Sequence, residues 1–95
     1  MNKEKIYSQI KNYFTDKPVK KVMLFGSFAK NENDETSDID LLITPLQPLG
    51  LFTLGRYVAD LEELINVKID LTTEGSMSKA FYNNIQNDLK LLYAK

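Results

Sequence analysis

The sequence contains no cysteine and no histidine. The absence of cysteine excludes a disulfide, a thiolate nucleophile and a cysteine zinc site. The absence of histidine excludes an imidazole base, a histidine metal ligand and a serine–histidine triad. Metal chemistry on this chain therefore has to use oxygen ligands.

Long apolar runs are also missing. No stretch approaches the ~20 apolar residues that a membrane-spanning helix needs. The first residues, Met1 to Glu4, lead directly into an amphipathic pattern and do not resemble a signal peptide. We therefore expect a cytoplasmic protein with no membrane partner.

Neither sign of charge is in clear excess, since 12 basic residues face 13 acidic ones and the net charge is −1. Binding to a nucleic-acid backbone normally goes with a basic excess, so a nucleic-acid partner is not expected. Half of the basic residues precede residue 22. We interpret them as a solvated helix face, with docking of an acidic partner or a nucleotide tail as the alternative.

The length of 95 residues predicts a single domain over residues 1–95. Such a domain buries roughly 60–65% of the surface of its unfolded chain, but it is too small for a second substrate-binding lobe. An acceptor substrate would therefore have to bring its own binding surface.

Two long segments have helical periodicity. Apolar residues recur at i, i+4, i+7 and i+8 over residues 3–14, and again at three- and four-residue intervals over residues 51–65. The second helix is expected to end at Asn66 as a left-handed cap. The loop before it, residues 44–50, is interrupted by prolines, and its leucines either pack beneath the site or face a partner.

The C-terminal part predicts a third helix over about residues 76–87, capped by a serine, with Phe81 and Ile85 facing inward. The final apolar segment, residues 89–93, fits either a continuation of that helix or a last strand.

Strands are expected over residues 20–25, 37–43 and 67–72. The first two should be antiparallel neighbours, because the short helix and loop between them are not a full crossover. We therefore expect an α+β fold in which a small mixed sheet of three to four strands is flanked by helices.

The most informative stretch is residues 22–43. An apolar strand stops abruptly at Gly26, and Ser27 begins a short helix. A glycine without a Cβ, followed by the unpaired N–H groups of a helix start, is a suitable place for a phosphate.

The chain then returns through Asp38 and Asp40, which share one face of a strand at a spacing of ~6.5–7 Å. Two like charges at this distance repel, and a hard divalent cation is the usual compensation. Mg²⁺ held by one or two carboxylates and by substrate phosphates is typical of phosphoryl and nucleotidyl transfer. The alternative is an edge strand whose acids discourage aggregation.

At these residues the chain resembles the nucleotidyltransferase superfamily that includes DNA polymerase beta, and specifically its minimal nucleotidyltransferase branch. The family signature is Gly-Ser, ten residues, then Asp-x-Asp. Here Gly26-Ser27 is followed by residues 28–37 and then by Asp38-Ile39-Asp40. The family commonly has arginine and glycine where this chain has Lys30 and Asn31, so the planar arginine fork is lost while the positive charge is kept.

The resemblance implies further site residues. A third carboxylate is expected on a neighbouring strand, and Asp70 supplies it. Two Mg²⁺ ions would be held by Asp38, Asp40 and Asp70, with Asp70 alternatively acting as general base. Gly26, Ser27 and Lys30 would bind the phosphates of ATP or another NTP. Arg56 is the single arginine, and nothing around it assigns a role.

The resemblance also implies a partner. Many minimal nucleotidyltransferases are encoded beside a HEPN ribonuclease toxin, transfer AMP to a tyrosine of that toxin and form an oligomer with it. Two other functions remain open from the residues. One is a non-catalytic antitoxin that keeps the acids without turnover. The other is nucleotidyl transfer to a small molecule or to an RNA end.

Overall fold

Helices and strands alternate along residues 2–95, the part of the chain that the computed structural model describes. The order is α1 (Lys3–Phe14), β1 (Val19–Phe25), α2 (Gly26–Ala29), β2 (Ile39–Pro45), α3 (Leu51–Ile65), β3 (Ile69–Thr73), η1 (Glu74–Ser76), α4 (Lys79–Ile85), η2 (Gln86–Asp88) and β4 (Lys90–Ala94). The two η elements are single 3₁₀ turns on either side of α4.

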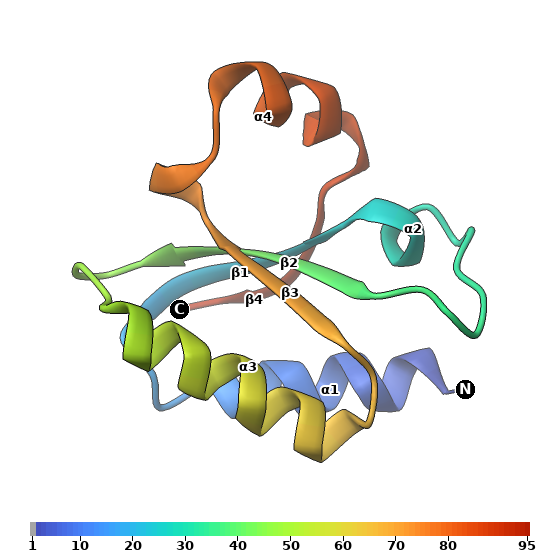
Figure 1. Cartoon of the computed structure of the whole chain (residues 1–95), viewed down its shortest axis with the longest axis horizontal. Helices are drawn as coiled ribbons and strands as arrows, with labels where there is room; N and C mark the ends of the chain where they lie inside the picture. Colours follow the sequence, from blue (N-terminus) through green and yellow to red (C-terminus); the bar gives the residue numbers. More distant parts are fainter. Residues whose placement is uncertain (1) are drawn as a thin grey trace.

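The strands form one mixed sheet in the order β3-β2-β1-β4. β1 is antiparallel to both β2 and β4, whereas β2 and β3 are parallel. The predicted antiparallel pair is confirmed, and the final apolar segment is a strand. Helices α1 and α3 lie together against one face of the sheet, while α4 lies on the opposite side (Figure 1).

The helix ends explain why the two long helices were predictable. The Asn2 side chain caps α1 by accepting a hydrogen bond of 3.1 Å from the backbone N–H of Lys5. Asn66 ends α3 in the left-handed conformation, with φ 62° and ψ 36°, as its identity predicted. Local capping residues thus agree with the apolar periodicity at these ends.

The main core lies between the sheet and the layer of α1 and α3. Ile10 and Phe14 of α1 and Leu61 of α3 are completely shielded from solvent. The periodicity did not single out Tyr57, which is buried on α3 and packs edge-to-face against Phe14 at a centroid distance of 5.7 Å. Such aromatic pairs stabilise by about 0.5–1.5 kcal/mol beyond the area they bury.

A polar contact closes the same interface. The hydroxyl of Tyr13 donates a hydrogen bond of 2.7 Å to Asp60 on α3. Burial, followed by this hydrogen bond and the charge of Asp60, raises the pKa of Tyr13 above its ordinary value. The two helices are therefore joined by apolar packing and by a partly buried polar bond.

The third predicted helix differs from expectation. α4 is shorter, ending at Ile85, and none of its residues is buried. The predicted inward orientation of Phe81 is wrong, because this residue is 45% exposed. Its ring still packs edge-to-face against Phe25, at a centroid distance of 6.0 Å. A helix of two turns has too little apolar surface to cover this face of the sheet.

Within residues 2–95, no helix is both long enough and apolar enough to cross a membrane.

Candidate active site

Gly26 lies directly beside Asp40, because Phe25 at the end of β1 is the register partner of Asp40 on β2. Gly26 has φ 75°, a left-handed conformation that favours glycine, and a Cβ built there would overlap the Asp40 carboxylate. The sequence suggested that this glycine leaves space for a ligand. In the structure it also leaves space for the carboxylate itself.

The parallel pairing of β2 and β3 places Asp70 opposite Asp40. This confirms that the strand carrying Asp70 lies next to the strand carrying Asp40. Asp40 is half-buried, whereas Asp70 is exposed. Asp38 precedes the first residue of β2, so it lies at the strand's entrance and not within the strand as predicted.

The electrostatics of Asp40 reflect this crowding. Burial, the charges of Asp70 and then Asp38, and a hydrogen bond with Asp70 together raise the pKa of the Asp40 carboxyl from 3.8 to about 6. A raised pKa at a carboxylate surrounded by other carboxylates means that its negative charge lacks compensation from the chain. Such perturbed groups gather at functional sites.

The donor set suits a hard divalent cation with two protein ligands. Mg²⁺ is commonly held by one or two carboxylates together with substrate phosphates, and Asp40 and Asp70 supply two. Across residues 2–95, no group of three or more acidic side chains is gathered so that it could hold a metal ion. The structure therefore brings Asp40 and Asp70 together, and the predicted metal ligation by all three acids stays a prediction.

The helix α2 begins at Gly26 without a side-chain cap, so no side chain occupies the N–H groups of its first turn. Phe28 anchors the helix, because its side chain is only 1% exposed. Ser27 is half-buried next to Gly26. Asn31 takes the left-handed conformation, with φ 59°, at the position where the family commonly has glycine.

Lys30 follows α2 and makes an ion pair with Asp88, with Nζ 3.8 Å from Oδ2. Sequence reasoning missed Asp88, because nothing in its local pattern connects it to a residue so far along the chain. Arg56 instead forms an ion pair with Asp60, with Nε 3.3 Å from Oδ1. Both residues are on α3, which lies with α1 against one face of the sheet (Figure 1).

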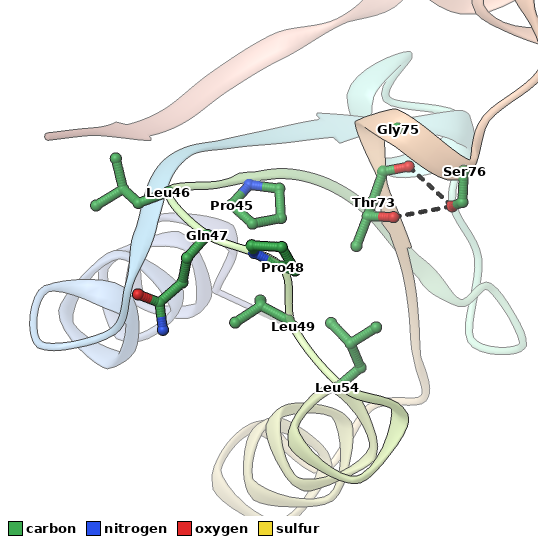
Figure 2. A pocket seen from close by; sticks show the side chains of 9 residues that line it. All are labelled: Pro45, Leu46, Gln47, Pro48, Leu49, Leu54, Thr73, Gly75 and Ser76. Atoms are coloured by element: carbon green, nitrogen blue, oxygen red, sulfur yellow. Dashed lines mark hydrogen bonds between the residues drawn. The ribbon is translucent and has the colours of Figure 1, made fainter.

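A hollow of about 550 Å³ is lined in part by Pro45, the last residue of β2, whereas Asp40 is near the start of that strand. Figure 2 shows the side chains that line the hollow. It is lined by the segment from Pro45 to Leu49, by Leu54 and by the turn after β3, and by none of the predicted site residues. Leu49 packs against the core while Leu46 is exposed. The acidic site is thus separate from this hollow.

Comparison with known proteins agrees with the architecture. The family model described as "Polymerase beta, Nucleotidyltransferase" matches residues 8–95. A protein of Methanocaldococcus jannaschii, provisionally named a protein adenylyltransferase, is 40% identical over 72 residues, which are 75% of this chain and 74% of that protein.

Two solved structures share the fold. A minimal nucleotidyltransferase superposes with a TM-score of 0.81 at 24% identity, covering 95% of each chain. A complex of the tri-AMPylated HEPN toxin of Shewanella oneidensis with its MNT antitoxin matches with a TM-score of 0.79 at 18% identity, covering 99% of this chain and 74% of the matched one.

A mixed four-stranded sheet that presents a Gly-Ser turn beside paired carboxylates defines a minimal nucleotidyltransferase fold. The chain belongs to the polymerase beta-type nucleotidyltransferase family, and it is accordingly an enzyme of the nucleotidyltransferase class.

Proposed function

We propose that residues 1–95 act as one nucleotidyltransferase domain that moves AMP from ATP to a tyrosine hydroxyl of a HEPN-type toxin, and that this makes it the toxin's antitoxin. The relative from Methanocaldococcus jannaschii, which is named a protein adenylyltransferase, supports a protein acceptor. The similar complex, in which an MNT antitoxin accompanies an AMP-carrying HEPN toxin, supports the identity of that acceptor.

One observation carries the proposal. Asp40 and Asp70 are neighbours across parallel strands, and Gly26 lies against Asp40. The Gly-Ser turn, which we propose binds phosphate, and two carboxylates thereby lie close together where β1, β2 and β3 adjoin. Phosphoryl chemistry depends mainly on such positioning and on electrostatic stabilisation.

The turn would bind the terminal phosphates of ATP through the backbone N–H groups of Gly26 and Ser27 and through the Ser27 hydroxyl. Lys30, whose own backbone N–H donates to the carbonyl of Gly26 at 3.2 Å, would neutralise phosphate charge. Asp38 and Asp40 would hold Mg²⁺, which leaves Asp70 for the acceptor hydroxyl. The metal supplies Lewis-acid stabilisation of charge that develops on the phosphate oxygens.

In the transfer step, Asp70 would accept the proton of the tyrosine hydroxyl. The tyrosine oxygen forms a bond to the α-phosphorus, while the bond from that phosphorus to the oxygen of the β-phosphate breaks. The products are an AMP-tyrosine ester and pyrophosphate. Asp70 suits this role because it is exposed to an incoming acceptor, whereas Asp40 is half-buried.

The test is incubation of the purified protein with Mg²⁺ and α-labelled ATP, alone and together with the candidate toxin encoded beside its gene. We expect label on a toxin tyrosine and a mass gain of one AMP per site, both lost in Asp38→Asn and on removal of Mg²⁺ by a chelator. Glu35→Gln removes a charge from the exposed loop after α2 and should leave labelling unchanged.

Absence of label with every NTP would contradict the proposal. Tight complex formation without label would instead identify a non-catalytic antitoxin. Label on an RNA end or on a small molecule would identify a different acceptor.

A further inference from the structure

The segment that carries the proposed phosphate site is too short to hold its own position. α2 has four residues, and a single helical turn is unstable in isolation because nucleation costs more than one hydrogen bond returns. Tertiary contacts must therefore fix it. One of these contacts is the packing of the buried Phe28 ring in the core.

Two side-chain contacts hold the end of this turn. Lys3 on α1 donates a hydrogen bond of 2.8 Å to the side chain of Asn31. Lys30 pairs with Asp88, which belongs to the turn after α4. The first contact does not involve the Lys30 side chain, whereas the second engages the ammonium group that would meet a phosphate.

The segment that carries Asp88 lies against the site but is held by few contacts. α4 buries none of its residues, and the ring of Phe81 touches Phe25, the residue that precedes Gly26. Asp88 and Phe81 therefore both attach the segment between β3 and β4 to the corner formed by β1 and α2. Among residues 2–95, Asp88 is the acid that pairs with Lys30.

The ion pair between Lys30 and Asp88 is weak enough for another anion to replace Asp88. The two side chains are 45% and 36% exposed, and their charged atoms lie 3.8 Å apart. Pairs with this exposure typically contribute about 0.2–1 kcal/mol, because water screens them. A triphosphate presents several negative charges to the same ammonium group and would compete successfully for it.

We propose that Asp88 is the internal counter-ion of Lys30, which nucleotide phosphate displaces on binding, and that Asp88 thereby limits the nucleotide affinity of the site. The inference rests on the proposed function. It assigns Asp88 a positioning role through Lys30, without contact to the reacting atoms.

The test is a double-mutant cycle read out as the affinity for a fluorescent ATP analogue in the presence of Mg²⁺. Asp88→Asn should tighten binding by up to about fivefold, the upper end of the range that a half-exposed pair implies. Lys30→Met should weaken binding. In the Lys30→Met background, Asp88→Asn should lose most of its effect, because no ammonium group remains to be released.

Two controls separate this mechanism from simple removal of negative charge. Glu35→Gln also removes one negative charge from the surface near α2, and it should change the affinity by much less than Asp88→Asn does. The melting temperature of the nucleotide-free protein should fall by about 1–8 °C in Asp88→Asn and in Lys30→Met. In the double variant the decrease should be smaller than the sum of the two single decreases.

The inference is overturned if Asp88→Asn weakens binding, if it matches Glu35→Gln, or if it tightens binding equally with and without Lys30. The proposed function fails separately, when wild-type protein binds the analogue yet labels no acceptor. Wild-type protein that binds no nucleotide overturns both.

Discussion

The two faces of β2 differ in what they contribute to the molecule. On one face, Ile39, Leu41 and Ile43 are fully shielded from solvent within the core that also includes α1 and α3. On the other face, Leu42 is also buried but lies outside that core cluster, and it is two residues from the half-buried Asp40. One strand therefore carries both the stabilising core and the acidic site.

The difference shows where stability and chemistry reside. The helix-covered face gains free energy from apolar burial and close packing. The acidic face holds a carboxyl group whose pKa is raised to about 6, so its charged form is disfavoured in the folded protein. Apolar packing on the first face therefore offsets the unfavourable burial of the Asp40 charge on the second face.

Truncation within the core should have the largest effect on folding. Leu61 is completely buried on α3, and Leu61→Ala should lower the free energy of unfolding by about 2–5 kcal/mol in chemical denaturation, from lost burial and a residual cavity. Transfer activity per folded molecule should stay near wild type. The matched control Leu64→Ala, at a side chain 49% exposed on the same helix, should change stability by less than about 0.5 kcal/mol. A loss of activity beyond the loss of folded protein would contradict this separation of the faces.

Gly26→Ala should affect both stability and activity. The left-handed backbone and the overlap with the Asp40 carboxylate should cost on the order of 1–3 kcal/mol of stability and should displace that carboxylate. Denaturant titration and the transfer rate would measure the two effects. Gly55→Ala is the control, because its Cβ would meet nothing within 4 Å, and alanine in the middle of α3 should stabilise by about 0.5–1 kcal/mol. Equal behaviour of the two variants would refute the assigned role of Gly26.

The acidic face should also give the protein a specific pH dependence. Because the pKa of Asp40 is about 6 in the folded protein and 3.8 as the ordinary value, the folded state binds a proton at intermediate pH that the unfolded state does not. The contribution of Asp40 to stability therefore rises as the pH falls through about 6, and it levels off below 3.8.

Asp40→Asn should accordingly be more stable than wild type at neutral pH, on the order of 1–2 kcal/mol after allowance for solvent screening. This advantage should vanish as the pH falls from about 6 to 3.8. Asp70→Asn should lower the pH at which this change in stability occurs, because the charge of Asp70 raises the pKa of Asp40. A stability difference that does not depend on pH would show that the carboxyl group of Asp40 is not perturbed.

The sequence predicted those parts of the fold that depend on local pattern. The two long helices have the expected bounds, because apolar periodicity and the asparagine caps act over neighbouring residues. The antiparallel pairing of β1 and β2 followed from the short connection between them. The position of Gly26 near the acids was expected from the same pairing, and the structure confirms it for Asp40.

Features that depend on contacts between distant segments were not predictable. Tyr57 lies outside the predicted apolar stripe, and its burial depends on how α3 packs against Phe14 of α1. The inward orientation expected for Phe81 was wrong because α4 is too short to bury any of its residues against the sheet. The pairing of Lys30 with Asp88 depends on the tertiary fold, which brings η2 close to the end of α2.

The most direct test of the account is to measure the rate of AMP transfer and the stability of Asp40→Asn side by side at neutral pH. The account predicts that transfer falls by at least ~100-fold, because the proposed metal ligand is lost, while the free energy of unfolding rises, because a charge leaves a crowded acidic site. Retained transfer, or a loss of stability as large as that of Leu61→Ala, would contradict the claim that the carboxylates of Asp40 and Asp70 form the active site.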